Sequence, residues 1–243
     1  MIEQLIMQLR TLKLNGMVSA LERQMEQPNT YDDLSFLERL QLLIDSETSE
    51  RESRKKSRLI NAAKFKIAAL PAEIDYTHSR DLKRDIMANL LQCHWLTKAQ
   101  NILLTGPCGS GKTYIACALG YEACTKGKSV KYYRVSRLML ALAQAKADGS
   151  YTKLLMQLAK LDCLILDDWG LEPLEAAQRN DLMEIMDDRH GAVSTMILSQ
   201  LPTDQWYQAI GDNTLADAIL DRVMHNAHRI KLKGESMRKN ADI

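Results

Sequence analysis

The chain has 243 residues, of which 46% are hydrophobic and 26% charged; these are the values of an ordinary globular protein, and they exclude a wholly disordered chain. Its 32 lysines and arginines nearly balance 31 acidic residues, a net charge of +1 that by itself argues against nucleic-acid binding. Membrane association is not expected, because no apolar run approaches the roughly 18 residues of a spanning helix.

Two further features of the sequence predict a cytoplasmic protein. The start, Met1-Ile2-Glu3-Gln4, lacks the basic segment and apolar core of a secretory signal. The five cysteines are odd in number and have no C-x-x-C spacing, so neither a disulfide framework nor a zinc site is expected. They are interpreted as small buried hydrophobic residues.

The first 70 residues have helical periodicity and no strand signal. Apolar residues recur at helical spacing from Leu5 to Met25, and Gln27-Pro28-Asn29 interrupts the pattern. Ser35 and Glu38 form a capping-box pattern before a second helical stretch. We therefore predict a small all-α N-terminal domain, residues 1–70, as the part that binds DNA or a partner protein.

Charge is strongly segregated within this region. Residues 1–50 hold nine acidic and four basic residues, whereas residues 51–66 hold seven basic residues and one acidic residue. Basic residues three or four apart share a helix face and can contact successive phosphates of a duplex. A solvated linker helix would show the same pattern. The candidate DNA-binding residues are Arg51, Arg54, Lys55, Lys56 and Arg58.

Residues 71–243 have the pattern of an α/β domain. Five short apolar segments alternate with helical segments, and we predict them to be strands: residues 101–105, 130–135, 163–166, 195–198 and 228–232. Apolar strands that alternate with helices are typical of a buried, mostly parallel sheet. The predicted fold is a parallel five-stranded sheet flanked by helices.

A phosphate-binding loop follows the first predicted strand. The sequence matches G-x-x-x-x-G-K-[ST], and a helical pattern comes directly after it. Backbone N–H groups of such a loop surround a phosphate, while Lys112 would neutralise the β- and γ-phosphates and the Thr113 hydroxyl would bind Mg²⁺. The predicted nucleotide-binding residues are Gly106, Pro107, Cys108, Gly109, Ser110, Gly111, Lys112 and Thr113.

Polar residues end two further strands. Asp167 and Asp168 follow an apolar strand, so Asp167 is a candidate Mg²⁺ ligand and Asp168 a candidate general base that activates water. The alternative for Asp168 is a helix N-cap. Ser199 and Gln200 end the next strand, where Gln200 can sense the γ-phosphate or form part of a turn. Paired acids beside a phosphate loop favour a Mg²⁺-dependent ATPase.

These motifs resemble those of AAA+ ATPases of the helicase-loader clade. The likeness includes the phosphate loop, residues 166–171 (LDDWGL) and residues 199–202 (SQLP). Residues 216–223 (ADAILDRV), 225–230 (HNAHRI) and 233–238 (KGESMR) are more specific, and they resemble the IstB-like ATP-binding proteins of IS21-family insertion sequences. The resemblance covers essentially the whole chain.

The resemblance implies a bacterial, DNA-associated helper of transposition. Such proteins assemble with ATP between subunits, bind duplex DNA, stimulate a partner transposase, and use hydrolysis to remodel or disassemble the assembly. Arg222 matches the arginine finger that reaches a neighbouring subunit's ATP; its alternative role is a local partner of Asp217 or Asp221. Gln200 matches the sensor position. The resemblance also implies an ATPase domain, residues 71–243, without a full C-terminal lid, and leaves Arg238 open as a second sensor.

Two alternatives share this ATPase core. One is a replicative helicase loader, and the other is a nucleotide switch without catalysis, which the intact Lys112, Asp167 and Asp168 disfavour. The helical segment at residues 136–160 resembles the clade's insertion. Its Arg137, Lys146 and Lys153 can face DNA, or its leucines can pack against a neighbouring subunit.

Overall fold

A computed structural model describes residues 2–77, 80–234 and 236–237 of the chain. The chain divides into two compact units, Met1–Arg58 and Leu59–Ile243, which are described separately. No helix among the described residues is both long and apolar enough to cross a membrane.

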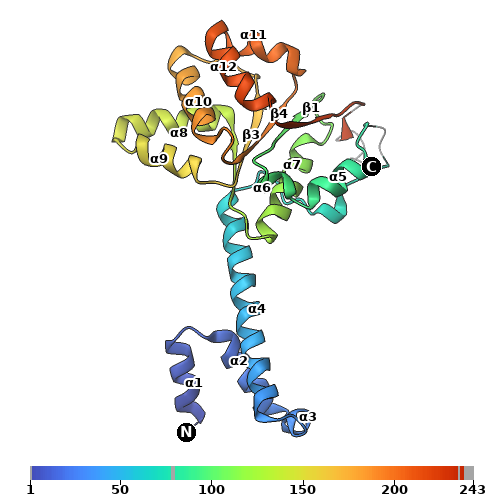
Figure 1. Cartoon of the computed structure of the whole chain (residues 1–243), viewed down its shortest axis with the longest axis vertical. Coiled ribbons are helices and arrows are strands. Elements are labelled where there is room, and N and C mark those ends of the chain that lie inside the picture. The colour runs from blue at the N-terminus through green and yellow to red at the C-terminus, as the bar shows by residue number, and fades with distance from the viewer. Residues whose placement is uncertain (1, 78–79, 235, 238–243) are drawn as a thin grey trace. The chain divides into compact units, whose positions relative to one another are not determined.

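The first unit is entirely helical. Its helices are α1 (Ile2–Thr11), α2 (Asn15–Glu26), α3 (Pro28–Tyr31) and the start of α4 (Phe36–Ala63), which continues into the second unit (Figure 1). The predicted capping box is confirmed, because the Ser35 amide and hydroxyl donate to Glu38 at 2.8 and 2.7 Å. The break between α1 and α2 was not predicted; there Lys13 adopts a left-handed conformation with φ of 60°.

A close helix crossing organises the first unit. A Cβ atom on Gly16 of α2 would lie 2.6 Å from the Glu47 Cα of α4, so only glycine permits this approach. The buried Glu47 carboxylate accepts hydrogen bonds from the amides of Gly16 and Met17, at 2.8 and 3.3 Å. These amides belong to the first turn of α2, so Glu47 supplies acceptors that this helix end lacks.

The second unit contains the predicted parallel five-stranded sheet, with strand order β2-β3-β4-β1-β5. The strands are β1 (Asn101–Thr105), β2 (Val130–Arg134), β3 (Cys163–Trp169), β4 (Ser194–Ser199) and β5 (Ala227–Lys231). All five predicted strands are confirmed. In this order β4 lies between β1 and β3. Polar residues at the end of β4 therefore lie between the ends of β1 and β3.

Helices cover both faces of this sheet (Figure 1). One face carries α5 (Arg84–Leu91), α6 (His94–Thr97) and α7 (Lys112–Thr125). The other carries α8 (Val135–Asp148), α9 (Tyr151–Ala159), α10 (Ala176–Arg189), α11 (Trp206–Ile210) and α12 (Asn213–Met224). Short 3₁₀ turns lie at η1 (Pro71–Glu73) and η2 (Thr203–Gln205).

The hydrophobic core has two halves, one on each side of the sheet. Along β1, Ile102 and Leu104 pack with α7, whereas Leu103 between them packs with the opposite helices. This alternation is the two-residue period of a strand buried on both faces. Residues 59–70 also belong to the second unit, where Ala63 and Ala69 are buried in the α7 half of the core.

Candidate nucleotide-binding site

The phosphate loop joins β1 to α7. Gly109 and Gly111 have φ values of 79° and 90°, in the left-handed region that favours glycine, and Lys112 begins the helix. The Lys112 ammonium donates to the carbonyl oxygens of Gly106 and Pro107, at 2.6 and 2.8 Å. The loop therefore presents a helix N-terminus and a lysine at one place, as phosphate binding requires.

Two distant segments pack against this loop. A Cβ on Gly109 would lie 2.0 Å from the Ser236 hydroxyl, and one on Gly111 would lie 2.2 Å from Nη1 of Arg80. The buried Arg80 guanidinium donates to the Ser110 carbonyl at 3.2 Å and also to the Asp75 carbonyl. These approaches leave no room for larger side chains at either glycine.

Asp167 lies beside the loop and is almost completely buried, with 3% of its surface exposed. Its Oδ2 accepts hydrogen bonds from the Thr113 hydroxyl at 2.9 Å and from the Tyr132 hydroxyl at 2.6 Å. Burial and the neighbouring Asp167 raise the pKa of Tyr132, so this phenol stays protonated as a donor. The hydroxyl and carboxylate oxygens of Thr113 and Asp167 are the hard ligands that fit Mg²⁺.

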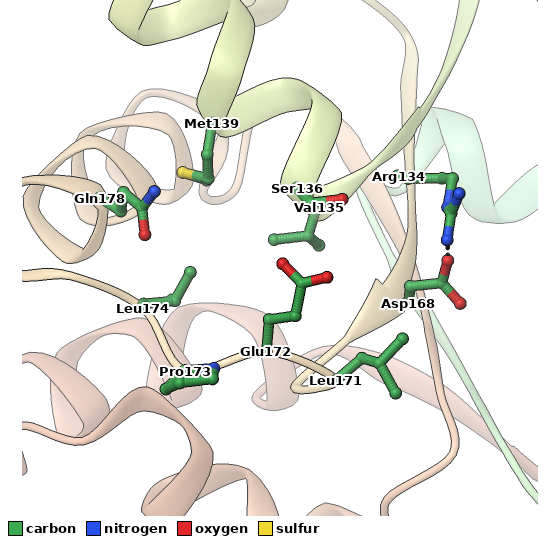
Figure 2. Close-up of a pocket in the computed structure, with 10 residues that line it drawn as sticks. All are labelled: Arg134, Val135, Ser136, Met139, Asp168, Leu171, Glu172, Pro173, Leu174 and Gln178. Atoms are coloured by element: carbon green, nitrogen blue, oxygen red, sulfur yellow. Dashed lines mark hydrogen bonds and ion pairs between the residues drawn. The ribbon is translucent and has the colours of Figure 1, made fainter.

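Asp168 occupies an irregular position near the end of β3. Its φ is 61°, and the pairing of β3 with β4 shifts between Leu166 and Trp169. The Asp168 carboxylate forms an ion pair with Arg134 of β2, with 2.6 Å between Oδ2 and Nε (Figure 2). The helix-cap alternative is wrong, because the next helix, α10, begins at Ala176 and is capped by Glu175.

Ser199 and Gln200 have different surroundings at the end of β4. The Ser199 hydroxyl is buried, donates to the Trp169 carbonyl at 2.7 Å and accepts from the Leu201 amide at 3.0 Å. Gln200 is exposed and lines the same cavity as Lys112. Of the two polar side chains, Gln200 is thus the one available to a ligand.

A cavity of about 350 Å³ joins these groups. Besides the phosphate-loop residues Cys108, Gly109 and Gly111, its polar lining comprises Lys66, Glu73, Asp75, Arg80, Lys112, Thr113, Tyr114, Asp167, Asp168, Ser199 and Gln200. A separate hollow of about 110 Å³ lies behind Asp168, between the start of α8 and the loop after β3, and Glu172 extends into it (Figure 2). The larger cavity contains the groups that nucleotide chemistry requires.

Arg222 lies away from this cavity in the same chain. Its guanidinium forms an ion pair with Asp187 of α10, at 2.7 Å, and also donates to the Ala218 carbonyl at 2.9 Å. The local partner is therefore Asp187, and the suggested pairing with Asp217 or Asp221 is wrong. Arg238 lies outside the described residues.

The basic residues of α4 are exposed on the helix surface. Arg51 and Arg54 pair with Glu47 and Glu50, one turn earlier, at 2.6 and 2.8 Å. Within the described part of the chain, no ion pair holds Lys55, Lys56 or Arg58. These last three residues are thus the most accessible cations of the stripe.

The predicted insertion consists of α8 and α9. Leu138 and Leu142 are buried in this chain's own core, so they do not pack against a neighbouring subunit, whereas Leu140 is exposed. Lys146 pairs with the buried Asp181 at 2.5 Å. Arg137 and Lys153 are exposed.

Sequence reasoning missed Lys66, Arg80, Tyr132 and Arg134. Each lies outside a recognisable motif. Tyr132 and Arg134 reach the site from the neighbouring strand β2, whereas Lys66 and Arg80 reach it from the segment between α4 and α5. The register of β2 against β3 places Arg134 opposite Asp167, and no local sequence pattern indicates this pairing. Of the five cysteines, Cys93, Cys117, Cys124 and Cys163 are buried as predicted, but Cys108 is exposed in the loop.

The sheet order, phosphate loop and paired acids define a P-loop protein with the AAA+ fold. Solved structures share that fold: the DnaC helicase loader has a TM-score of 0.57 and 20% identity, with 67% of this chain and 97% of that chain covered. AMPPCP-bound DnaA from Aquifex aeolicus has a TM-score of 0.58 and 17% identity, with 73% and 54% covered.

The chain belongs to the family described as IstB-like ATP binding protein, which matches residues 7–242. The insertion sequence ATP-binding protein y4pL of Sinorhizobium fredii is 45% identical over 232 residues, 96% of this chain and 94% of that protein. The IS1162 ATP-binding protein of Pseudomonas fluorescens is 46% identical over 204 residues, 84% and 88% of the two chains. The chain is therefore a member of a family of ATP-binding proteins, and the cavity beside Lys112 is its candidate nucleotide site.

Proposed function

We propose that the protein hydrolyses ATP with Mg²⁺. The observation that carries this proposal is the 2.9 Å contact between Thr113 and Asp167 beside Lys112. Lys112 neutralises the β- and γ-phosphates, Thr113 and Asp167 hold the metal, and Asp168 accepts a proton from the attacking water. Gln200 orients the γ-phosphate or that water. Bound Mg²⁺ would neutralise charge that develops on the phosphate oxygens.

Assembly is the second part of the proposal. Arg222 acts in trans, so that ATP bound to one copy is completed by the finger of the next copy in a homo-oligomer. An arginine in trans makes hydrolysis depend on assembly. Release of Arg222 from Asp187 would accompany formation of that contact. The pair is accessible, because Asp187 is 62% exposed.

The assembly acts on duplex DNA as a helper of transposition. Residues 1–70 form the part that binds DNA or a partner, through the basic stripe of α4, and the ATPase unit stimulates the partner transposase and then disassembles after hydrolysis. The relatives are named as ATP-binding proteins of insertion sequences, which supports this role. A bacterial cytoplasmic location follows from it.

ATP turnover tests the proposal. Phosphate release is measured with and without duplex DNA, in the wild type and in Lys112→Ala. We expect turnover that rises with DNA and with protein concentration, and loss of nucleotide binding in Lys112→Ala because the phosphates lose their cation. A wild-type protein that binds ATP without turnover, under all of these conditions, would contradict the hydrolysis proposal.

A replicative helicase loader is the second candidate, favoured by the fold shared with the DnaC loader over 97% of that chain. The two functions differ in the nucleic acid that stimulates the ATPase. Stimulation by duplex DNA and by the transposase supports the transposition helper. Stimulation by single-stranded DNA together with a replicative helicase supports the loader.

A further inference from the structure

A second lysine reaches the metal-binding carboxylate. Lys66 lines the nucleotide cavity, and its ammonium nitrogen lies 4.0 Å from Oδ2 of Asp167. The Lys66 side chain is 39% exposed, whereas that of Asp167 is 4% exposed. The ammonium therefore approaches a buried carboxylate from the cavity, the side from which a nucleotide would enter.

The backbone around Lys66 is fixed against the second unit. The Phe65 ring packs over Gly120 of α7, where a Cβ would lie 2.7 Å from Cε1 of the ring. Lys64, with φ of 54°, directly follows α4, and Lys131 donates to the Ala62 carbonyl in the last turn of that helix at 2.9 Å. Lys66 thus projects from an anchored segment, and its reach to Asp167 follows from the fold.

The Asp167 carboxylate needs a counter-charge when no metal is bound. It accepts three neutral donors, the hydroxyls of Thr113 and Tyr132 and the amide of Asp168, but these hydrogen bonds do not cancel its charge. An unneutralised carboxylate in this cavity repels the phosphates of a nucleotide. Mg²⁺ removes that repulsion when present, and the Lys66 ammonium is placed to do so when Mg²⁺ is absent.

We propose that Lys66 is a built-in counter-ion of Asp167 that stands in for Mg²⁺ and allows the site to hold nucleotide without metal. This inference rests on the proposed Mg²⁺ site at Thr113 and Asp167. Lys66 acts through Asp167 and does not touch the phosphates. Its removal therefore makes nucleotide binding more dependent on Mg²⁺, and it leaves the phosphate loop intact.

A double-mutant cycle on the full chain tests this inference, with the affinity for a fluorescent ATP analogue as the readout. Affinity is measured in Mg²⁺ and in EDTA for the wild type, Lys66→Met, Asp167→Asn and the double variant. We expect Lys66→Met to weaken binding about tenfold in EDTA and by less than about twofold in Mg²⁺. In the Asp167→Asn background, the same substitution should have no effect in EDTA.

Two control variants separate position from charge. Lys66→Arg keeps the cation and should preserve metal-free binding, whereas Lys64→Met removes a lysine from the same connector and should behave as the wild type. Unchanged EDTA affinity in Lys66→Met would overturn the inference. So would an effect that persists with Asp167→Asn, because Lys66 would then contact the nucleotide directly. Absence of any nucleotide binding by the wild type would overturn the proposed function as well.

Discussion

The Nε atom of Arg134 lies 2.6 Å from Oδ2 of Asp168, so the proposed general base is held by a cation from the neighbouring strand. This ion pair raises the pKa of Arg134, principally through the hydrogen bond between the two side chains. The Oδ2 atom of Asp168 must leave this contact before it can accept a hydrogen bond from an attacking water. We expect Arg134 to restrain Asp168 until this contact is broken.

Removal of this restraint should accelerate hydrolysis in the absence of DNA. Arg134→Gln is expected to raise DNA-independent phosphate release by up to about fivefold, the range for loss of an exposed ion pair, with nucleotide affinity unchanged. Arg137→Gln, a nearby exposed arginine, is the matched control. Slower turnover in Arg134→Gln would show that the pair holds Asp168 in its productive position.

Asp168→Asn provides the complementary measurement. It should lower turnover by about 10²–10⁴-fold, because the attacking water loses its base, and it should trap an assembled state on DNA. Turnover of Arg134→Gln combined with Asp168→Asn should be as slow as that of Asp168→Asn alone. Rapid hydrolysis by either variant that lacks Asp168 would assign the base to another residue.

The basic stripe of α4 should control the salt dependence of DNA binding. Charge reversal of Lys55, Lys56 and Arg58 to glutamate should weaken duplex binding, because these side chains would no longer neutralise phosphates. The slope of log affinity against log salt should fall by about 0.9 for each phosphate that is no longer neutralised. The measurement is fluorescence anisotropy of labelled duplex over a series of salt concentrations.

The matched control reverses three exposed lysines of the second unit, Lys98, Lys126 and Lys160, and produces the same change in net charge. This control should retain the wild-type slope. If instead the α4 variant keeps that slope and the control variant does not, the DNA site lies on the ATPase unit.

A mixing experiment should distinguish a finger in trans from a local role of Arg222. Arg222→Ala and Lys112→Ala are each expected to be inactive, but their mixture should recover part of the turnover. In the mixture, ATP bound to the intact phosphate loop of an Arg222→Ala subunit can be contacted by Arg222 of a neighbouring Lys112→Ala subunit. Asp187→Asn removes the local partner and should remain active. Equal loss in Asp187→Asn and Arg222→Ala, without recovery on mixing, would indicate that the pair is structural.

Glu47 should make the first unit sensitive to acid. Burial opposes its ionisation, but hydrogen bonds from Arg51, Met17 and Gly16 outweigh this effect and lower the pKa of Glu47. A carboxyl group whose pKa is lower in the folded state stabilises the fold at pH values above its ordinary pKa of 4.5. This stabilisation is lost as the pH falls through the pKa of the folded state.

Glu47→Gln should therefore destabilise the crossing of α2 and α4 by about 1–3 kcal/mol at neutral pH. Hydrogen exchange of the full chain should show faster exchange at the Gly16 and Met17 amides, and the difference from wild type should shrink in acid. Glu50→Gln, which breaks an exposed pair with Arg54, is the control and should have little effect. Equal protection of Gly16 in the wild type and Glu47→Gln would refute this role.

The limits of sequence reasoning follow from the range of each interaction. The strands and the phosphate loop were predictable, because apolar runs and the spacing of Gly106, Gly111 and Lys112 are local signals. The pairing of Arg134 with Asp168 depends on strand register, and the approach of Lys66 to Asp167 depends on how a connector packs against α7. Neither relationship has a local pattern. The family resemblance supplied a role for Arg222, but its partner Asp187 emerged only from helix packing.

The exposure of Cys108 gives this nucleotide site a chemical handle of its own. Burial raises the pKa of the other four thiols, to about 12 for Cys124 and Cys163, so they react slowly with alkylating reagents. Cys108 lies in the loop that would surround a bound phosphate. The unmodified protein therefore carries a single accessible thiol whose rate of alkylation reports on ligand occupancy, without the introduction of a label.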